Sequence, residues 1–161
     1  MKTLLLILAI FATQDHKEPL RAELLLSIDS DKKSKFFNLV WDDAKTVCDK
    51  TGLPMYLLMA QAALESGWAT SRLAKEQNNY LGIKYNHKYA TFKTRLECFE
   101  AWSRVLQQSC YKELKVATLN GWLYQLEHCT YHQSENYSNK IRSIYHANNL
   151  DIVDSWEINK K

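Results

Sequence analysis

The chain has 161 residues, of which 46% are hydrophobic and 24% are charged, and its formal net charge is +3. This size and composition fit one compact domain with a hydrophobic core, and no segment is of low complexity. Because the basic residues are scattered among acidic ones rather than gathered in a stripe, we expect no nucleic-acid partner.

The amino terminus carries a short apolar run from Leu4 to Ala12, preceded by Lys2. The run is about half the length that spans a bilayer, so residues 1–12 are predicted to be an export signal rather than a membrane anchor. An ordinary buried first segment remains the alternative. Cleavage is left open because Ile10 is a poor match to the small residue expected before a cleavage site.

Residues 13–35 form a mostly polar leader, predicted to be either a linker or a short first helix. Apolar residues then recur at helical spacing over 36–50, and Gly52 and Pro54 predict the end of that helix and the start of the next. The next helix, about 54–65, is apolar on nearly all sides, as expected of a central helix surrounded by others.

Glu65 is the exception in this apolar helix, and it falls in the last turn. The negative end of the helix dipole and the neighbouring apolar side chains Leu64 and Trp68 are both expected to raise its pKa. A carboxyl group that keeps its proton near neutral pH can act as a general acid on a glycosidic oxygen. A glutamate whose carboxylate simply reaches water at the helix end remains the alternative.

The four cysteines, Cys48, Cys98, Cys110 and Cys129, have no CxxC or CxxH spacing, so we predict no zinc site. Up to two disulfides could form if the chain is exported, with three pairings open, and four buried thiols remain the alternative. Cys98 to Cys110 is the least favoured pair, because both are expected near opposite ends of one helix, roughly 18 Å apart.

A longer segment around Glu65 resembles a known catalytic signature. The stretch ALESGWATSRLAKEQNNYLGIK, the later KYATFKTRLECFEAW and the element TYHQSENYSNKI are similar to motifs of the peptidoglycan N-acetylglucosaminidases, glycoside hydrolase family 73. That family includes autolysins and the flagellar muralytic domain. The resemblance covers about residues 37–150.

The resemblance implies a mainly α, lysozyme-like α+β fold, in which a helical domain and a small extended β lobe flank a glycan-binding cleft. It places the glucosaminidase domain at 36–152 and leaves 153–161 as a tail. It implies cleavage on the reducing side of N-acetylglucosamine, with peptidoglycan glycan strands as the partner. We expect a monomeric, exported enzyme of the cell envelope or exterior, encoded by a bacterium or, as a lysin, by a phage.

Carried over by position, the resemblance implies site residues. Glu65 is expected to be the catalytic acid and Tyr131 a second catalytic residue. The expected substrate-binding residues are Trp68, Asn78, Asn79, Tyr80, Lys84 and Tyr137. Read from the residues alone, Trp68 and Tyr137 are typical packing residues, and the two asparagines are typical turn formers.

The chain departs from the family pattern in three places. Ala69 stands where the family usually has Gly, and Tyr80 and Leu81 replace Leu and Phe, both interpreted as tolerable packing changes. Gln133 and Ser134 replace Thr and Asp, which puts in doubt an acidic partner for Tyr131.

A second catalytic carboxylate is not evident. Residues 85–95 contain no Asp or Glu, and Glu97 has the spacing of a helix capping box with Thr94. We therefore expect a substrate-assisted route in which the sugar's 2-acetamido group attacks the anomeric carbon after Glu65 protonates the leaving oxygen. An inverting route with a distant base remains open.

The remaining helices are expected over 95–108, 119–129 and 136–147. His128 and His132 have a metal-ligand spacing, but a turn around Thr130 is expected to separate them, so we predict no metal and no cofactor. Two alternatives to the glucosaminidase stay open. A lytic transglycosylase or muramidase also carries a Glu-Ser pair at a helix end, and a non-catalytic glycan-binding domain could keep the cleft without turnover.

Overall fold

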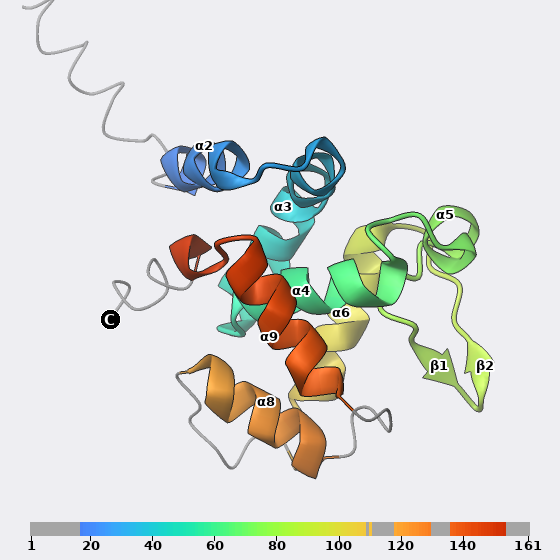
Figure 1. Cartoon of the computed structure of the whole chain (residues 1–161). Coiled ribbons are helices and arrows are strands. Elements are labelled where there is room, and N and C mark those ends of the chain that lie inside the picture. The colour runs from blue at the N-terminus through green and yellow to red at the C-terminus, as the bar shows by residue number, and fades with distance from the viewer. Residues whose placement is uncertain (1–16, 109, 111–117, 130–135, 154–161) are drawn as a thin grey trace, which may run out of the picture.

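The structure, a computed structural model, describes residues 17–108, 110, 118–129 and 136–153. Helices dominate it, and a small two-stranded antiparallel sheet extends from one side (Figure 1). The elements are α2 Lys17–Ser27, α3 Asp31–Thr51, α4 Met55–Ser66, α5 Arg72–Gln77, β1 Lys84–Tyr85, β2 Lys88–Tyr89, α6 Arg95–Leu106, α8 Leu119–His128 and α9 Tyr137–Ala147. The predicted fold class, mainly α with a small β lobe, is confirmed.

Helix α4 is the centre of the core. Every residue from Met55 to Ala63 is at most 2% exposed. The helix packs against α3 and α9, and α3 in turn packs against α6, so α4 is enclosed as its all-round apolar sequence predicts (Figure 1). Only the last turn of α4, which carries Glu65, reaches the edge of the core.

Helix α3 begins at Asp31, five residues before the first apolar residue that predicted it. Its first turn is polar and includes an exposed ion pair between Lys35 and Asp31, so it shows no hydrophobic periodicity. The predicted end is correct. Gly52 adopts a left-handed conformation with φ of 72° and donates its N–H to the carbonyl of Cys48.

The leader contains helix α2, so of the two predicted forms the short helix is right. Leu24 is fully buried in the main core, and Arg21 donates hydrogen bonds to Asn38 and Asp42 of α3. The first helix is thereby part of the same packed body.

The predicted export segment, 1–12, lies outside the described residues, as does all but the first residue of the predicted tail. Within the described part of the chain, no helix combines the length and apolar character needed to cross a bilayer.

Strands β1 and β2 form a tight hairpin. Lys84 pairs with Tyr89 and Tyr85 with Lys88. The two residues between the strands, Asn86 and His87, have φ of 50° and 64°, the conformation of a type I′ turn. This turn matches the right-handed twist of the strands and fixes their register.

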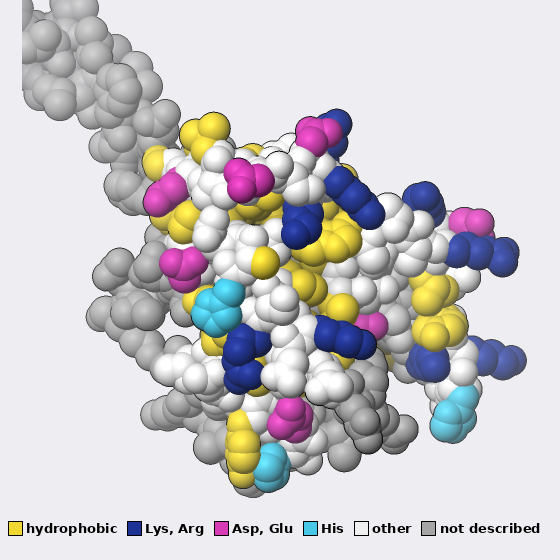
Figure 2. All heavy atoms as spheres, in the orientation of Figure 1, with side chains coloured by type: hydrophobic (Ala, Val, Ile, Leu, Met, Phe, Trp, Pro, Cys, Tyr) yellow, Lys and Arg dark blue, Asp and Glu magenta, His cyan; other side chains and the backbone are white. Residues whose placement is uncertain are grey.

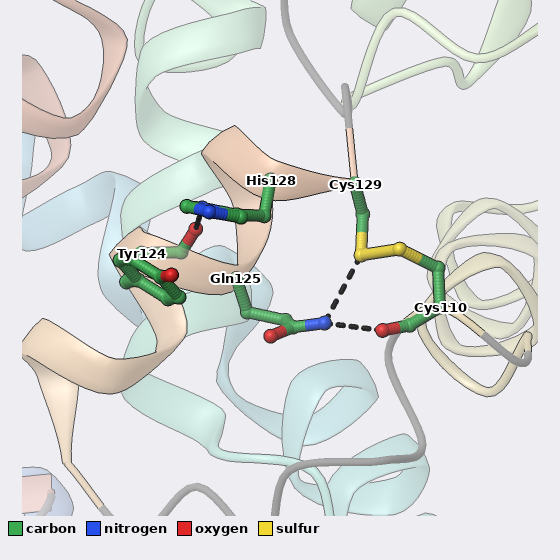
Figure 3. Close-up of a disulfide and its surroundings, with 5 residues drawn as sticks. All are labelled: Cys110, Tyr124, Gln125, His128 and Cys129. Carbon is green, nitrogen blue, oxygen red and sulfur yellow. Dashed lines mark hydrogen bonds between the residues drawn. A yellow bond between two sulfur atoms is a disulfide. The ribbon is translucent and has the colours of Figure 1, made fainter.

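Helix α6 ends at Leu106, and Gln107 follows as its cap. The prediction that Cys98 and Cys110 lie in one helix is therefore wrong. Cys110 instead forms a disulfide with Cys129, the residue that ends α8, with their Cα atoms 5.9 Å apart. Gln125 of α8 donates hydrogen bonds to the Cys110 carbonyl and the Cys129 Sγ (Figure 3). The other two cysteines, Cys48 and Cys98, are buried thiols.

Candidate active site

Glu65 occupies the last turn of α4 and is half-buried. The helix ends immediately after it, where Gly67 donates its N–H to the carbonyls of Ala63 and Leu64. Ser66 is fully buried. Its hydroxyl donates to the carbonyl of Ala62 at 2.6 Å and accepts the N–H of Ala69 at 2.8 Å. The serine of the Glu-Ser pair therefore closes the helix end and has a structural role.

Three consecutive residues after this end adopt left-handed backbone conformations. Gly67, Trp68 and Ala69 have φ of 56°, 63° and 63°. Such angles suit glycine and cost other residues energy. The departure at Ala69 is therefore more than the packing change interpreted from the sequence, because the position needs a backbone that glycine adopts without strain.

Gly82 brings the loop before β1 close to the candidate acid. It has φ of 62°, and a Cβ built on it would lie 3.5 Å from Oε2 of Glu65. A backbone without a side chain thus faces the carboxylate of Glu65. The isolated glycine in the apolar segment YLGIK was a sequence signal for such a close backbone approach.

The two predicted substrate-binding asparagines hold the hairpin in place. Asn79 is 1% exposed. Its Nδ2 donates to the carbonyls of Ile83 and Ala90, and its Oδ1 accepts the N–H of Ile83, all at 2.9 Å. Asn78 caps α5 and donates to the carbonyls of Phe92 and Lys93. The turn-forming interpretation is supported, and we call this pair the asparagine clamp.

Trp68 packs on the start of α3. Its ring makes edge-to-face contacts with Phe36 and Phe37, with centroids 5.5 and 5.7 Å apart, and Lys33 Nζ lies 5.2 Å from its centre. The side chain is only half-buried, so part of it remains accessible, three residues after Glu65 in the chain.

The other predicted contact residues differ in exposure. Tyr80 is 8% exposed, and Tyr137 is 4% exposed with its hydroxyl accepting a hydrogen bond from Gln61. Both positions are typical of packing residues. Lys84 is exposed on β1, with Nζ 4.5 Å from the centre of the Tyr89 ring. Tyr131 lies outside the described residues.

The carboxylates that follow the hairpin have structural partners. Thr94 caps α6 by accepting the N–H of Glu97, and Glu97 accepts the N–H of Lys93 at 2.8 Å, so the predicted capping interaction is present. Glu100 lies 3.9 Å from Lys50. Within the described residues, no group of three His, Cys, Asp or Glu side chains is arranged to hold a metal.

Gln61 is a buried polar residue that the sequence analysis did not single out. It lies one turn before Glu65 on α4 and is fully buried. Its amide accepts the indole N–H of Trp102 on α6 at 2.8 Å and donates to the Tyr137 hydroxyl on α9 at 2.9 Å. The signal was available, because a lone glutamine interrupts the apolar run just as Glu65 does.

Cys98 lies beneath the loop that leads to Gly82. Burial raises the pKa of its thiol from 9.0 to about 11, although hydrogen bonds from the backbone of Tyr80 and Leu81 act in the opposite direction. The thiol is therefore protonated at neutral pH and is part of the packing between α6 and the loop.

Comparison with solved structures shows the same fold in two bacterial proteins. The catalytic domain of the autolysin Auto from Listeria monocytogenes superposes with a TM-score of 0.65 and 22% identity, covering 84% of this chain and 96% of that domain. The glycoside hydrolase domain of FlgJ from Salmonella typhimurium gives a TM-score of 0.62 and 22% identity, covering 79% and 96%. Comparison with curated protein sequences gives no match.

The sequence profile of the glucosaminidase family, described as mannosyl-glycoprotein endo-beta-N-acetylglucosaminidase, matches residues 41–150. The match includes α4 with Glu65, the asparagine clamp, the hairpin and α9. Because it covers well over half of the chain, the protein belongs to the glucosaminidase family and is a glycoside hydrolase.

Proposed function

We propose that this protein is a peptidoglycan hydrolase that cleaves the β-1,4 bond on the reducing side of N-acetylglucosamine, with Glu65 as the general acid. The family description and the fold shared with an autolysin domain support the class of reaction and substrate. One observation carries the choice of residue. Glu65 is the acidic residue of the central helix, half-buried beside the bare backbone of Gly82.

The position of Glu65 suits proton donation. At the carboxyl end of α4 the negative end of the helix dipole opposes a negative charge, which suits a group proposed to hold and donate a proton. Gly82 presents backbone without a side chain to Oε2, and we propose that the sugar oxygen approaches the carboxyl group at this point. The rest of the helix is buried in the core, which fixes the position of the backbone that carries the carboxyl group.

The route we propose is substrate-assisted. Glu97 caps α6 and Glu100 pairs with Lys50, so neither of these two carboxylates is offered as the second one. The oxygen of the 2-acetamido group attacks the anomeric carbon while the bond to the leaving oxygen breaks and that oxygen takes the proton of Glu65. Water then opens the cyclic intermediate and returns a proton to Glu65.

Other residues are proposed to bind or orient the sugar chain. Trp68 offers a partly accessible ring three residues after Glu65 in the chain, and Lys84 follows Gly82 by two residues on the hairpin. Tyr131 is proposed to orient the acetamido group. For Asn78, Asn79, Tyr80 and Tyr137, the contacts described above support indirect roles in shaping the site. We further propose that the enzyme acts as an exported monomer.

Digestion of purified peptidoglycan tests this proposal. Wild type and Glu65→Gln are incubated with sacculi, the products are reduced with borohydride, and the new ends are identified by mass spectrometry. We expect reduced N-acetylglucosamine ends from the wild type and at least a thousandfold fewer from the variant. Glu97→Gln is the matched control, because its amide oxygen can still accept the N–H of Lys93 and its activity should be retained.

The products separate the alternatives. Anhydromuramyl or reduced muramic ends would replace the glucosaminidase with a transglycosylase or muramidase. Binding to sacculi by a folded wild type that releases no products would favour a glycan-binding domain instead. Full activity of Glu65→Gln would exclude Glu65 as the acid.

A further inference from the structure

The hairpin lies in an unusually cationic part of the chain. Residues 77–96, between Glu76 and Glu97, contain no Asp or Glu but include Lys84, Lys88, Lys93 and Arg95. The formal charge of this segment exceeds that of the whole chain, which is +3. A local excess of one sign raises the concentration of oppositely charged groups at that surface.

Two of these cations are available on the hairpin itself. Arg95 is engaged with Asp43 at 2.7 Å, whereas Lys84 and Lys88 form no ion pair with any described carboxylate. Both lysines are exposed, and each lies directly across the ribbon from a tyrosine. The lysine charges therefore remain available to an anion from outside the chain.

The tyrosines complete the surface. Tyr85 is 55% exposed and Tyr89 is 50% exposed, two of the few large hydrophobic side chains that the described residues leave in water. In the register of the strands, Lys84 and Tyr89 share one face of the ribbon, and Tyr85 and Lys88 share the other. Figure 2 shows yellow, dark blue and cyan side chains over the hairpin, and no magenta there on this face.

The hairpin lies close to Glu65, and this position narrows the choice of anionic groups that could reach it. Gly82 lies against Glu65, and β1 starts two residues later, so the ribbon begins beside the proposed acid. The base of the ribbon is therefore within reach of a glycan strand bound at Glu65. In peptidoglycan the carboxylates beside such a strand are those of the peptide stems, which project from alternate sugars.

We propose that the hairpin 84–89 is a binding surface for the carboxylates of peptide stems on the substrate strand. Lys84 and Lys88 attract the carboxylates, and the tyrosine rings contact the apolar parts of the stems. The inference rests on the proposed function and deepens it, because such a surface would make the enzyme selective for strands that carry acidic stems. As the lysines are exposed, the attraction is screened by salt over a Debye length of about 8 Å at 0.15 M.

The test compares two forms of one substrate. Sacculi free of teichoic acid are acetylated on their amines and used either with free carboxyl groups or after carbodiimide coupling of those groups to methylamine. The glycan strand is the same in both, and only the stem charge differs. Binding is measured by sedimentation with proteins that also carry Glu65→Gln, so that the substrate is not cleaved. Turnover is measured as product release by proteins that keep Glu65. Both measurements are made at 20 mM and 300 mM salt.

Lys88→Glu is the test variant and Lys50→Glu the matched control, since Lys50 is an exposed lysine at the far end of α3. We expect three- to tenfold tighter binding of carboxylate sacculi over amidated sacculi at low salt, and loss of most of this preference at high salt. Lys88→Glu should lose the preference at low salt while it binds amidated sacculi as before. Lys50→Glu should keep the preference.

The inference would be overturned if the protein bound carboxylate and amidated sacculi equally at low salt. It would also be overturned if Lys88→Glu weakened binding to both substrates by the same factor. Binding that follows teichoic acid phosphates added back to amidated sacculi would overturn it too, in favour of a wall-polymer site. Turnover separates this result from the main proposal. An enzyme that binds with the expected preference but releases no N-acetylglucosamine ends would contradict the proposed hydrolysis and leave the hairpin surface in place.

Discussion

The residues after Glu65 hold an unfavourable backbone. A left-handed conformation costs a residue with a Cβ roughly 1–2 kcal/mol, and Trp68 and Ala69 both adopt it. Local contacts maintain it, because Trp68 donates its N–H to the carbonyl of Ala63 at 2.9 Å and Ala69 donates to the hydroxyl of Ser66. Strain of this kind tends to gather at functional sites, and here it lies directly beside the proposed acid.

Ala69→Gly should raise the free energy of unfolding by about 0.5–1 kcal/mol, because relief of the left-handed strain exceeds the greater chain entropy of glycine in the unfolded state. Urea unfolding followed by circular dichroism measures the change. The control is Ala22→Gly at an exposed position inside α2. This substitution should lower the free energy of unfolding by about 1 kcal/mol. The same sign for both substitutions would show that the backbone at Ala69 is unstrained.

Asn79→Ala should lower the free energy of unfolding by about 3 kcal/mol, because it leaves the N–H of Ile83 and the carbonyl of Ala90 without their partner, while the carbonyl of Ile83 keeps the N–H of Ala90. The proper comparison is Asn78→Gly, which keeps the left-handed cap and removes more exposed bonds, and should cost about 1 kcal/mol. Urea unfolding gives both values. If Asn79→Ala changed substrate affinity but left stability unchanged, Asn79 would be a substrate contact rather than part of the clamp.

At the scale of elements, α4 shows how a buried helix can carry a reactive group. Its apolar side chains meet α3 and α9, and Gln61 fixes its rotation through hydrogen bonds to α6 and α9. Gln61 and Glu65 are four residues apart and therefore project from the same side of the helix. The network that orients the helix thus also sets the side of the helix from which the Glu65 side chain projects.

The contact between α6 and the loop at Tyr80 predicts a pH dependence. The pKa of Cys98 rises from 9.0 to about 11 on folding, so between these values the unfolded chain loses the proton that the folded chain keeps. The unfolding free energy should therefore fall as pH rises from 9 to 10.5, by about 1.5 kcal/mol from this group alone. Cys98→Ala removes the contribution while all other groups titrate as before, so the difference in urea unfolding between the two proteins isolates it. A parallel fall in both proteins would contradict a buried, protonated thiol.

At the scale of the whole molecule, hydrophobic periodicity predicted the major helices, and the capping residues Gly52 and Thr94 predicted where two of them end or begin. It failed at the start of α3, where the turn at Asp31 is polar and exposed. In the site, Glu65 was identifiable as a carboxylate out of place. The role of Asn79 was not, because its partner Ala90 lies eleven residues away and no local pattern reveals that contact.

The disulfide between Cys110 and Cys129 should stabilise the whole chain by restricting the unfolded state. It closes a loop with a sequence separation of 19, for which chain entropy gives about 3 kcal/mol. Replacing both cysteines by serine should lower Tm by roughly 10 °C, measured by calorimetry. Thiol titration in denaturant should find two reactive thiols in the wild type, Cys48 and Cys98, and the same two in the variant. Four reactive thiols in the wild type would contradict the bridge.

The asparagine clamp ties the hairpin to the short stretch of chain that follows the proposed acid. Glu65, the approach of Gly82 and the closing bond to Ala90 all fall within one continuous stretch of the chain. Contacts between residues close in sequence form with little loss of chain entropy, so this stretch is suited to assemble early during folding. One exchanged segment between related hydrolases would also carry the acid, the loop at Gly82 and the cationic hairpin together.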